Sequence, residues 1–536
     1  MLKSKSRRWG TGGPFKRPIW AVMIGLVAAG LAIAGCAGSS PAKSTSGARI
    51  ASAKGGTLTF GIPSGPSTMD AAKDSSYDTY SLMRYLSNEP ILEVNPNTGA
   101  IGPGLATSYS YVGEDNLAFK LTIGQGNRFS DGTTVTAASV KAWLEYFTKA
   151  NGPFSAFLPI KSIVTPTKWT VEMTFSAPTA NVPFYLTGIN NIGFVTGPKG
   201  LADPSSLATS TDGAGPYEYD ASESVTNNHY TFLPNPYYPG HSAIKWKKIV
   251  VKVITTPSSM LEAMQSGQVD VAIGDPSTAA AAESDGLSVK YAPQGWDGIT
   301  WTDREGRKSK PLGSALVRQA LNYAVNRKAI TQAMLGKYGV PTDQWTTTDG
   351  FSEAYNNYYT YDPTKAKQLL AKAGYPNGFT LPVVDEGDIG NLGDPLIQAI
   401  AQELKAVGVT LKITTDSTTT AWLQAAESTS FAGFGNAWGT SAMSNFYDLM
   451  FAPKGVLNQF NVVDPVINRW EAEAAKAPPA QAASLARDIS IRMVTQGDIL
   501  AVAEYPALVY AQKNIAGLSV TPWFLFVGAA TQWSQG

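Results

Sequence analysis

Apolar and polar positions alternate along several short stretches of the chain. Residues 57–62 and 411–414 show this alternation, and residues 249–254 are rich in β-branched side chains, so each stretch is predicted to be a strand. Residues 431–439 contain three glycines among apolar side chains and are predicted to be a strand that runs into a loop.

Two amphipathic helices are predicted in the C-terminal half. Between residues 315 and 335 the apolar side chains recur mostly at spacings of three and four, which indicates one helix with one buried face. A second helix begins at Asp362, a capping residue followed by Pro363, and ends at Gly374. Strands and helices alternate with no internal repeat, so the body of the chain is predicted to be α/β.

The first 35 residues have the composition of an export signal. Six Lys and Arg residues and no acid precede an apolar run over residues 19–33. Residues 33–36, Ile-Ala-Gly-Cys, are similar to a bacterial lipobox, so we expect Cys36 to be lipidated and to become the mature N-terminus. The alternative is an uncleaved anchor, for which a run of roughly 15 apolar residues is short. The pair Arg7 and Arg8 leaves open whether export follows the general or the twin-arginine route.

Composition excludes several classes of function. Cleavage before Cys36 leaves 36 Lys and Arg residues against 41 Asp and Glu residues, a net charge of −5, so a nucleic-acid partner is not expected. With one cysteine and only His229 and His241 as histidines, neither a disulfide nor a metal site is expected, and no cofactor is predicted. Residues 36–55 are rich in small polar side chains and are predicted to be a flexible tether.

No sequence motif predicts catalysis. The chain has no Gly-x-Ser-x-Gly elbow, no Walker A loop and no His-Glu-x-x-His pair, and the glycines of residues 433–439 miss the spacing of a dinucleotide-binding loop. Asp131 is expected to be a turn residue and Asp270 a loop or cap residue. We therefore expect no enzyme activity, with a hydrolase as a remote alternative.

Five sequence blocks follow the order that one protein family shows. They are residues 128–137, residues 213–217 with 235–238, residues 264–270, residues 318–327 and residues 361–375. The first combines a strand, an Asp-Gly turn and a Thr-capped helix. Together with residues 97–106, these blocks resemble the large extracellular solute-binding proteins of ABC importers, specifically the peptide, oligopeptide and nickel family. The resemblance covers nearly all of the mature chain.

This resemblance implies an α/β, type II periplasmic-binding-protein-like fold, in which two lobes are joined by a hinge and an extra domain is inserted in the first lobe. Lobe I would comprise residues 56–95, 212–292 and 508–536, the extra domain residues 96–211, and lobe II residues 293–507. The implied protein is a monomer that is anchored by lipid outside the cell membrane. It closes around a solute and delivers it to the permease subunits of an ABC importer.

The resemblance also locates one wall of the ligand site. Peptide binders of the family carry a Trp-x-x-Asp or Trp-x-Ala-Asp motif whose Asp pairs with the ligand's ammonium group, but the matching residues 438–445 contain no carboxylate. Neutral groups there suit uncharged hydrogen-bonding partners. The candidate ligand-binding residues are Asn436, Trp438, Thr440, Ser441 and Asn445. A peptide remains the first choice of solute because peptides are the family's commonest ligands, and a neutral oligosaccharide or another uncharged small molecule is the alternative.

A second wall is expected at the crossover into lobe II. The glycines of residues 294–301 permit close approach of a ligand, and Trp296 and Trp301 are suited to stack on a ring or an apolar group. Asp297 is either the displaced negative charge or a solvated turn residue. Ser64, after the first strand, is expected to line lobe I. Core packing is the competing interpretation for each tryptophan.

Two other classes of protein make distinct structural predictions. An interaction or cell-envelope assembly protein that reuses this fold would have no deep pocket between its lobes. A hydrolase would have convergent acid and base groups inside that pocket.

Overall fold

The computed structural model describes residues 55–75, 77–95, 99–152, 155, 158–345, 349–387, 392–416, 419–520 and 533–535. The predicted export signal, Cys36 and all but the last residue of the predicted tether lie outside these ranges. None of the helices in these ranges combines the length and the apolar character that a membrane span requires.

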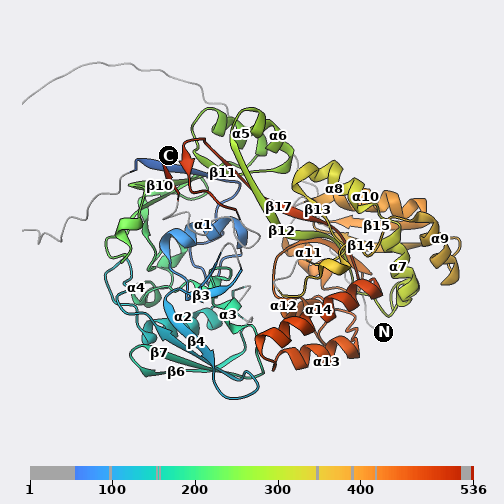
Figure 1. The fold of residues 1–536 in the computed structure, drawn as a ribbon, viewed down its shortest axis with the longest axis horizontal. Helices are drawn as coiled ribbons and strands as arrows, with labels where there is room; N and C mark the ends of the chain where they lie inside the picture. The colour runs from blue at the N-terminus through green and yellow to red at the C-terminus, as the bar shows by residue number, and fades with distance from the viewer. Residues whose placement is uncertain are drawn as a thin grey trace, which may run out of the picture. The chain divides into compact units, whose positions relative to one another are not determined.

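One large mixed sheet organises these residues (Figure 1). Along its main path the strands are β15 (Val409–Thr415), β14 (Phe379–Asp385), β16 (Gly433–Gly439), β12 (Ser288–Trp301), β17 (Ile499–Ala511), β11 (Val271–Ile273), β1 (Thr57–Ile62), β10 (Lys248–Val253), β9 (His229–Pro234) and β8 (Tyr217–Val225). A further strand, β13 (Val340–Pro341), pairs with β17. The sheet contains both parallel and antiparallel pairs, which is common in a large α/β sheet.

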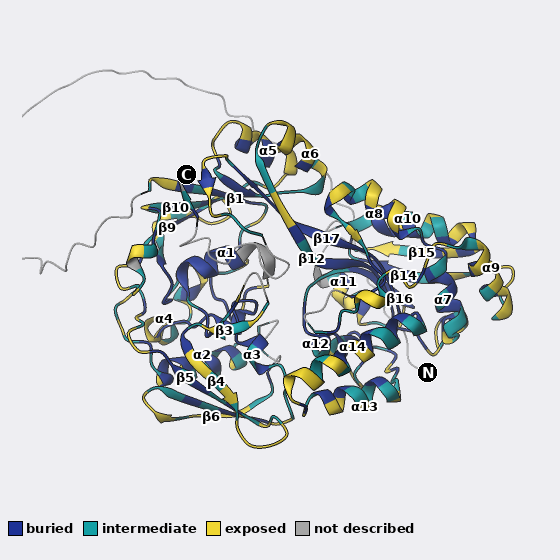
Figure 2. Ribbon diagram, viewed as in Figure 1, coloured by how far each residue is buried: buried dark blue, intermediate teal, exposed yellow. Residues whose placement is uncertain are grey.

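Two long antiparallel strands connect the N-terminal and C-terminal parts of this sheet. β12 and β17 pair from Ser288 opposite Ala511 to Thr300 opposite Ile499. The C-terminal end of β17 also pairs with β11, and the C-terminal end of β12 pairs with β16. All residues of β17 are buried, and Figure 2 shows this strand in dark blue.

Helices cover both faces of the C-terminal part of the sheet. The first face packs against α7 (Ala315–Tyr323), α8 (Arg327–Leu335), α9 (Pro363–Lys372) and α10 (Gly393–Ala406). The other face packs against α11 (Thr419–Ala426), α12 (Met443–Met450), α13 (Pro465–Ala474) and α14 (Pro479–Gln496). The N-terminal part carries α1 (Tyr77–Ser87), α5 (Pro257–Gln265) and α6 (Pro276–Ser284).

A second, antiparallel sheet lies within the segment predicted as the extra domain. Its strands, in spatial order, are β4 (Ala106–Tyr111), β5 (Ala118–Ile123), β7 (Thr170–Phe175) and β6 (Ile160–Thr167). The helices of this segment are α2 (Ala137–Lys149), α3 (Val182–Tyr185) and α4 (Pro198–Ala202). Small two-stranded sheets pair β2 (Leu92–Val94) with β3 (Ile101–Pro103) and β18 (Ile515–Ala516) with β19 (Ser534–Gln535). The exact boundaries of the lobes and of the extra domain stay predictions.

Several local predictions are confirmed. The strands expected at residues 57–62, 249–254 and 411–414 are β1, β10 and β15. Asp362 caps α9, since its carboxylate accepts a hydrogen bond from the Lys365 N–H over 2.8 Å. Asp131 is a turn residue that accepts the Thr133 N–H over 2.8 Å, and Thr136 and Ser139 form a capping box at α2.

The single helix predicted over residues 315–335 is wrong, because the chain forms two helices there, α7 and α8. The break has a local cause. The Asn326 side chain accepts a hydrogen bond from the Ala329 N–H over 3.1 Å and so starts a new helix. The Tyr323 carbonyl, at the end of α7, accepts the Asp362 N–H over 2.8 Å instead of a bond within a continuing helix.

Candidate functional site

The pairing of β12 with β16 decides which predicted residues share a surface. Trp296 lies opposite Trp438, and Gly298 lies opposite Asn436. Since side chains alternate between the two faces of a strand, Trp296, Trp438 and Asn436 lie on the face that packs against α11 and α12. Asp297 points to the opposite face of the sheet. The structure therefore brings the first three residues together and separates Asp297 from them.

Trp296 and Trp438 belong to an aromatic cluster. Trp296 is completely buried and stacks on Trp345, with ring centroids 5.4 Å apart. Trp345 contacts Phe446 at 4.7 Å, and half-buried Trp438 meets the same phenylalanine edge-on at 5.9 Å. Only Trp438 of this pair keeps surface that a ligand can touch in this structure.

Trp301 lies on the face of Asp297, completely buried in the core that packs against α7 and α10. Trp301 is therefore a core-packing residue, as the alternative interpretation of the tryptophans predicts, and it is not part of the proposed site.

Asn436 is buried without satisfying its amide. Its side chain is 1% exposed, and neither its nitrogen nor its oxygen has a hydrogen-bond partner among the residues that the structure describes. A buried amide that lacks partners costs about 1–3 kcal/mol, so proteins rarely keep one without a use. Asn436 is therefore the predicted residue whose surroundings most favour a contact with a ligand.

Asp297 is a buried strand residue, so the interpretation as a solvated turn residue is wrong. Its side chain is 5% exposed, and its carboxylate accepts a hydrogen bond from the Leu392 N–H over 3.1 Å. Burial raises the pKa of Asp297 to about 7, and the nearby Asp385 adds to the rise. Together with Glu386, whose carboxylate accepts the Ala437 N–H, these acids line a small hollow beneath α10.

The remaining predicted residues are engaged locally or lie elsewhere. The Thr440 hydroxyl donates to the Gln294 carbonyl over 2.7 Å, and the Asn445 amide donates to the Ser441 hydroxyl over 2.9 Å at the start of α12. Ser64 is exposed in the loop after β1, in the N-terminal part of the sheet.

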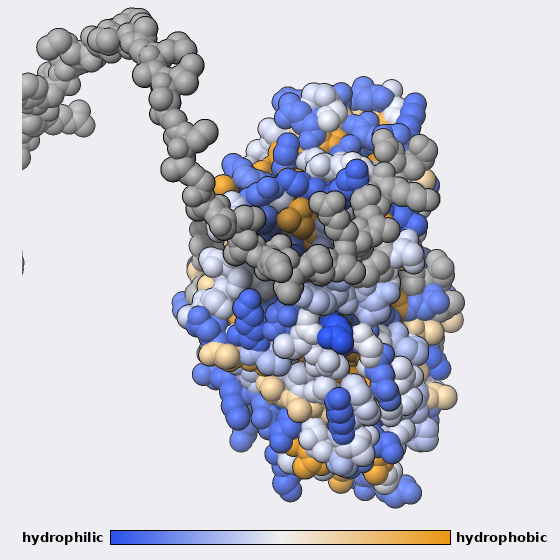
Figure 3. Space-filling view, turned by 90° about the vertical axis from the view of Figure 1, so that its left-hand side faces the viewer, coloured by the Kyte–Doolittle hydropathy of each residue, from blue (hydrophilic) through white to orange (hydrophobic). Residues whose placement is uncertain are grey.

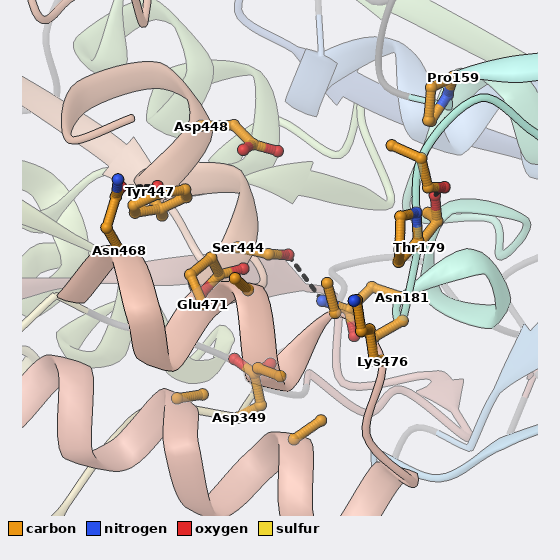
Figure 4. A pocket seen from close by; sticks show the side chains of 18 of the residues that line it. Pro159, Thr179, Asn181, Asp349, Ser444, Tyr447, Asp448, Asn468, Glu471 and Lys476 are labelled. Carbon is orange, nitrogen blue, oxygen red and sulfur yellow. Dashed lines mark hydrogen bonds between the residues drawn. The ribbon is translucent and has the colours of Figure 1, made fainter. Parts of the chain in front are cut away.

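Helix α12 forms a wall of a cavity of about 550 Å³. One side of the cavity comes from α12, α13 and α14, and the other from Pro159, residues 177–181 and Tyr185 of the inserted segment (Figure 4). The Asn181 amide donates to the Ser444 hydroxyl over 2.6 Å, and the Asn116 amide donates to the Ala475 carbonyl over 3.0 Å. The cavity thus lies between two parts of the chain that are far apart in sequence.

Carboxylates dominate the charge of this cavity. Asp349, Asp448 and Glu471 line it, and Lys476 is the one lysine or arginine among its lining residues. The pKa of Glu471 is raised to about 8, mainly by burial and in part by the neighbouring Asp448 and Asp349, because like charges disfavour ionisation. Burial also raises the pKa of Asp349 to about 6, although its carboxylate accepts the Met443 N–H over 2.9 Å.

None of these three acids is among the residues predicted from the sequence. The family's motif places the acid within residues 438–445, whereas Asp448 follows one turn later on α12 and the other two come from distant segments. Glu471 left a signal, since it stands on the apolar face of α13 with Ile467 and Ala474 at spacings of four and three. An acid at a core-facing helical position is a candidate for function.

A metal ion requires a tighter arrangement of ligands than the one seen here. Within the described ranges, no three His, Cys, Asp or Glu side chains gather closely enough to hold one.

A mixed sheet with two long shared strands, an inserted antiparallel sheet and a cavity between distant segments is the architecture of a two-lobed solute-binding protein. The family model for bacterial extracellular solute-binding proteins, family 5, matches residues 100–458. The chain belongs to this family.

Similar proteins of known name agree with this assignment. The glutathione-binding protein GsiB of Salmonella typhimurium is 27% identical over 338 residues, which cover 58% of this chain and 60% of that protein. The chain thus matches about 60% of the length of its curated relatives. Among solved structures, the periplasmic binding protein DppA of Helicobacter pylori, in complex with the peptide STSA, superposes with a TM-score of 0.73 at 18% identity, covering 90% of this chain and 98% of that one. NikA of Brucella suis, in complex with Fe(III)-EDTA, superposes with a TM-score of 0.76 at 18% identity, covering 90% of this chain and 100% of that one. These likenesses confirm the predicted type II fold with two lobes.

Proposed function

We propose that this chain is the solute-binding receptor of an ABC importer, which captures a peptide between its lobes and delivers it to the membrane permease. The observation that carries the proposal is the cavity of about 550 Å³, which takes its walls from the inserted segment and from the C-terminal helices. A ligand held there touches both parts, so its binding favours their approach. Family membership and the glutathione-binding and peptide-bound relatives support the class of solute.

The volume of the cavity fits this class. Pockets for small molecules usually enclose about 300–1,000 Å³, and a cavity of this size accepts a short peptide segment or a few side chains. Asn436 on β16 is not among the residues that line this cavity, but its unpartnered amide is a further hydrogen-bonding group for a ligand. The same amide favours the second candidate, a neutral oligosaccharide or another uncharged small molecule, because sugar hydroxyls both donate to and accept from an amide.

A thermal-shift screen tests the proposal on the mature chain, residues 36–536, with Cys36→Ser to avoid lipidation. The ligands are di- to hexapeptides, with and without N-acetylation, and cello-, malto- and xylo-oligosaccharides. A ligand at 100 times its dissociation constant stabilises the folded state by about 2.7 kcal/mol, which raises the melting temperature measurably. Stabilisation by oligosaccharides alone would replace the peptide with the second candidate.

The cellular setting is part of the proposal. Cys36 is lipidated, and residues 36–55 tether a monomeric receptor outside the cell membrane. Mass spectrometry of the N-terminal peptide is expected to show a diacylglycerol-modified Cys36, and the Cys36→Ser chain is expected to leave the membrane fraction. The receptor carries out no chemical step.

A further inference from the structure

The acidic cavity has a buried carboxyl group that the protein leaves without a partner among the described residues. Glu471 lines the cavity with a side chain that is 9% exposed, and its carboxylate has no hydrogen bond or ion pair within the described residues. Figure 4 shows it beside Ser444 and Asp349, facing the residues of the inserted segment. Burying a carboxylate without a partner is costly, and a positively charged ligand group offsets that cost.

Several of the other polar groups of the cavity already have hydrogen-bond partners. The Asn181 amide donates to Ser444, and the Tyr447 hydroxyl donates to the side-chain oxygen of Asn468. Lys476 is exposed, beyond the end of α13. What the cavity offers to a ligand is therefore mainly carboxylate oxygen, which only accepts hydrogen bonds when ionised.

Size and lining favour an organic cation over a bare ion. A water molecule takes up about 30 Å³ in the liquid, so 550 Å³ is far more than a single ion needs. Apolar surface from Tyr185 and from alanines of α13 and α14 lies beside the acids. An alkyl chain packs on such surface while its charged end pairs with the carboxylates.

We propose that this cavity binds an ammonium or guanidinium group and so makes the receptor selective for cationic solutes. The proposal rests on the proposed receptor function. It also accounts for the absence of a carboxylate in residues 438–445, because Glu471, Asp349 and Asp448 supply the negative charge for the ligand instead.

Isothermal titration calorimetry tests the selectivity on the mature Cys36→Ser chain. The probes are the blocked tripeptide acetyl-Ala-Lys-Ala-amide, the uncharged acetyl-Ala-norleucine-Ala-amide, the same norleucine peptide with a free amine, and agmatine. We expect the cationic probes to bind at least about tenfold more tightly than the blocked norleucine peptide, which is about 1.4 kcal/mol. The free-amine arm distinguishes an α-ammonium group from a side-chain cation.

Glu471→Gln is the decisive variant, because it keeps the shape of the side chain and removes the charge. We expect it to abolish the preference for cations. Glu473→Gln is the matched control, since Glu473 lies on the same helix but is exposed, 3.9 Å from Arg469. Asp448→Asn, at an exposed position of the cavity wall, is a second variant if Glu471→Gln fails to fold.

The pH dependence separates a cation from a neutral ligand. A bound cation favours ionised Glu471, so affinity for the lysine peptide is expected to rise from pH 6 to pH 9 as the proton is lost. The charged and titratable groups around Glu471 are Asp448 and Tyr447 on α12, Asp349, Tyr185 on α3, Lys476, and Arg487 on α14 near Asp349. Affinity that falls over this range would indicate a hydrogen bond from the protonated acid and overturn the proposal.

The outcomes distinguish the two proposals. Equal binding of the lysine and blocked norleucine peptides overturns the selectivity and leaves the peptide receptor intact. Equal losses in Glu471→Gln and Glu473→Gln overturn the role of this cavity. Binding of agmatine without any peptide supports the cation site and overturns the peptide, and binding of no probe overturns both.

Discussion

The side-chain amide of Asn181 donates a hydrogen bond to the Ser444 hydroxyl over 2.6 Å. Asn181 precedes α3 in the inserted segment, and Ser444 lies in the first turn of α12, 263 residues later. Both residues line the acidic cavity, so the bond joins its two walls beside the proposed ligand (Figure 4). A movement that separates these two walls at Ser444 has to break it.

Removal of this bond is expected to weaken solute binding. A hydrogen bond of this kind contributes about 0.5–1.5 kcal/mol, so Asn181→Ala and Ser444→Ala should each raise the dissociation constant about twofold to tenfold. The double variant should lose no more than the larger single effect, because both changes remove the same bond. Titration calorimetry with a solute that binds measures the dissociation constants of the single and double variants. Fully additive losses would contradict a shared contact.

The Arg318–Asp498 pair is expected to be a major contributor to stability. The two side chains are 3.0 Å apart and nearly buried, and Arg318 also donates to the Leu312 carbonyl over 2.7 Å. Asp498→Asn leaves a buried guanidinium group without its counter-charge, so the free energy of unfolding should fall by about 3–5 kcal/mol in a urea titration. Glu283→Gln, which breaks the exposed pair with Lys337, should lower the free energy of unfolding far less, because solvent screens that pair. Similar losses in both variants would contradict this assignment.

Stability of the ligand-free protein is expected to fall as the pH rises from about 4.5 to about 8. Glu471 has a pKa of about 8 in the folded state because it is buried, and one of about 4.5 when the chain unfolds. Across this range the folded state holds the proton that the unfolded state has lost, so folding becomes less favourable. Asp297, with a pKa raised to about 7, acts in the same direction. Urea unfolding at pH 5 and pH 8 measures the change.

Glu471→Gln supplies the control for this pH effect. The variant cannot ionise at this position, so its loss of stability between pH 5 and pH 8 should be smaller than that of the unmodified protein. At pH 4, where the glutamic acid is protonated in the folded state, the two proteins should differ little. An unchanged pH profile would show that Glu471 is not buried as an acid.

The elements that sequence predicts well are those whose signal is local. The alternating strands β1 and β15 and the Asp362 cap of α9 depend on neighbouring residues, and each forms as expected. The wrong prediction at residues 315–335 involves a distant contact in addition to the local Asn326 cap. The break between α7 and α8 is reinforced by the bond that the Asp362 N–H gives to the Tyr323 carbonyl, which no periodicity reveals.

The polarity of the surface is a feature that the sequence predicts, whereas the location of the site is not. On the face drawn in Figure 3, hydrophilic and neutral residues cover most of the area, and hydrophobic residues that reach the surface form small groups. Composition predicts this mixture. The location of the site does not follow from composition, because Asp349, Asp448 and Glu471 come from separate helices and loops. Their meeting depends on how α12 and α13 pack, and sequence spacing carries no measure of that.

Replacement of Asn436 by leucine is expected to separate stability from binding. The amide is 1% exposed and has no partner in the described part of the chain, so an apolar side chain of similar size removes an unsatisfied buried group. We expect Asn436→Leu to raise the free energy of unfolding by about 1 kcal/mol and to weaken solute binding by about tenfold or more. Chemical unfolding and calorimetry on the same preparation measure the two effects. If the variant binds solute as tightly as the unmodified protein, Asn436 is a packing residue and the proposed wall is limited to Trp438 and the start of α12. If it loses both stability and binding, its amide has a partner in the ligand-free protein.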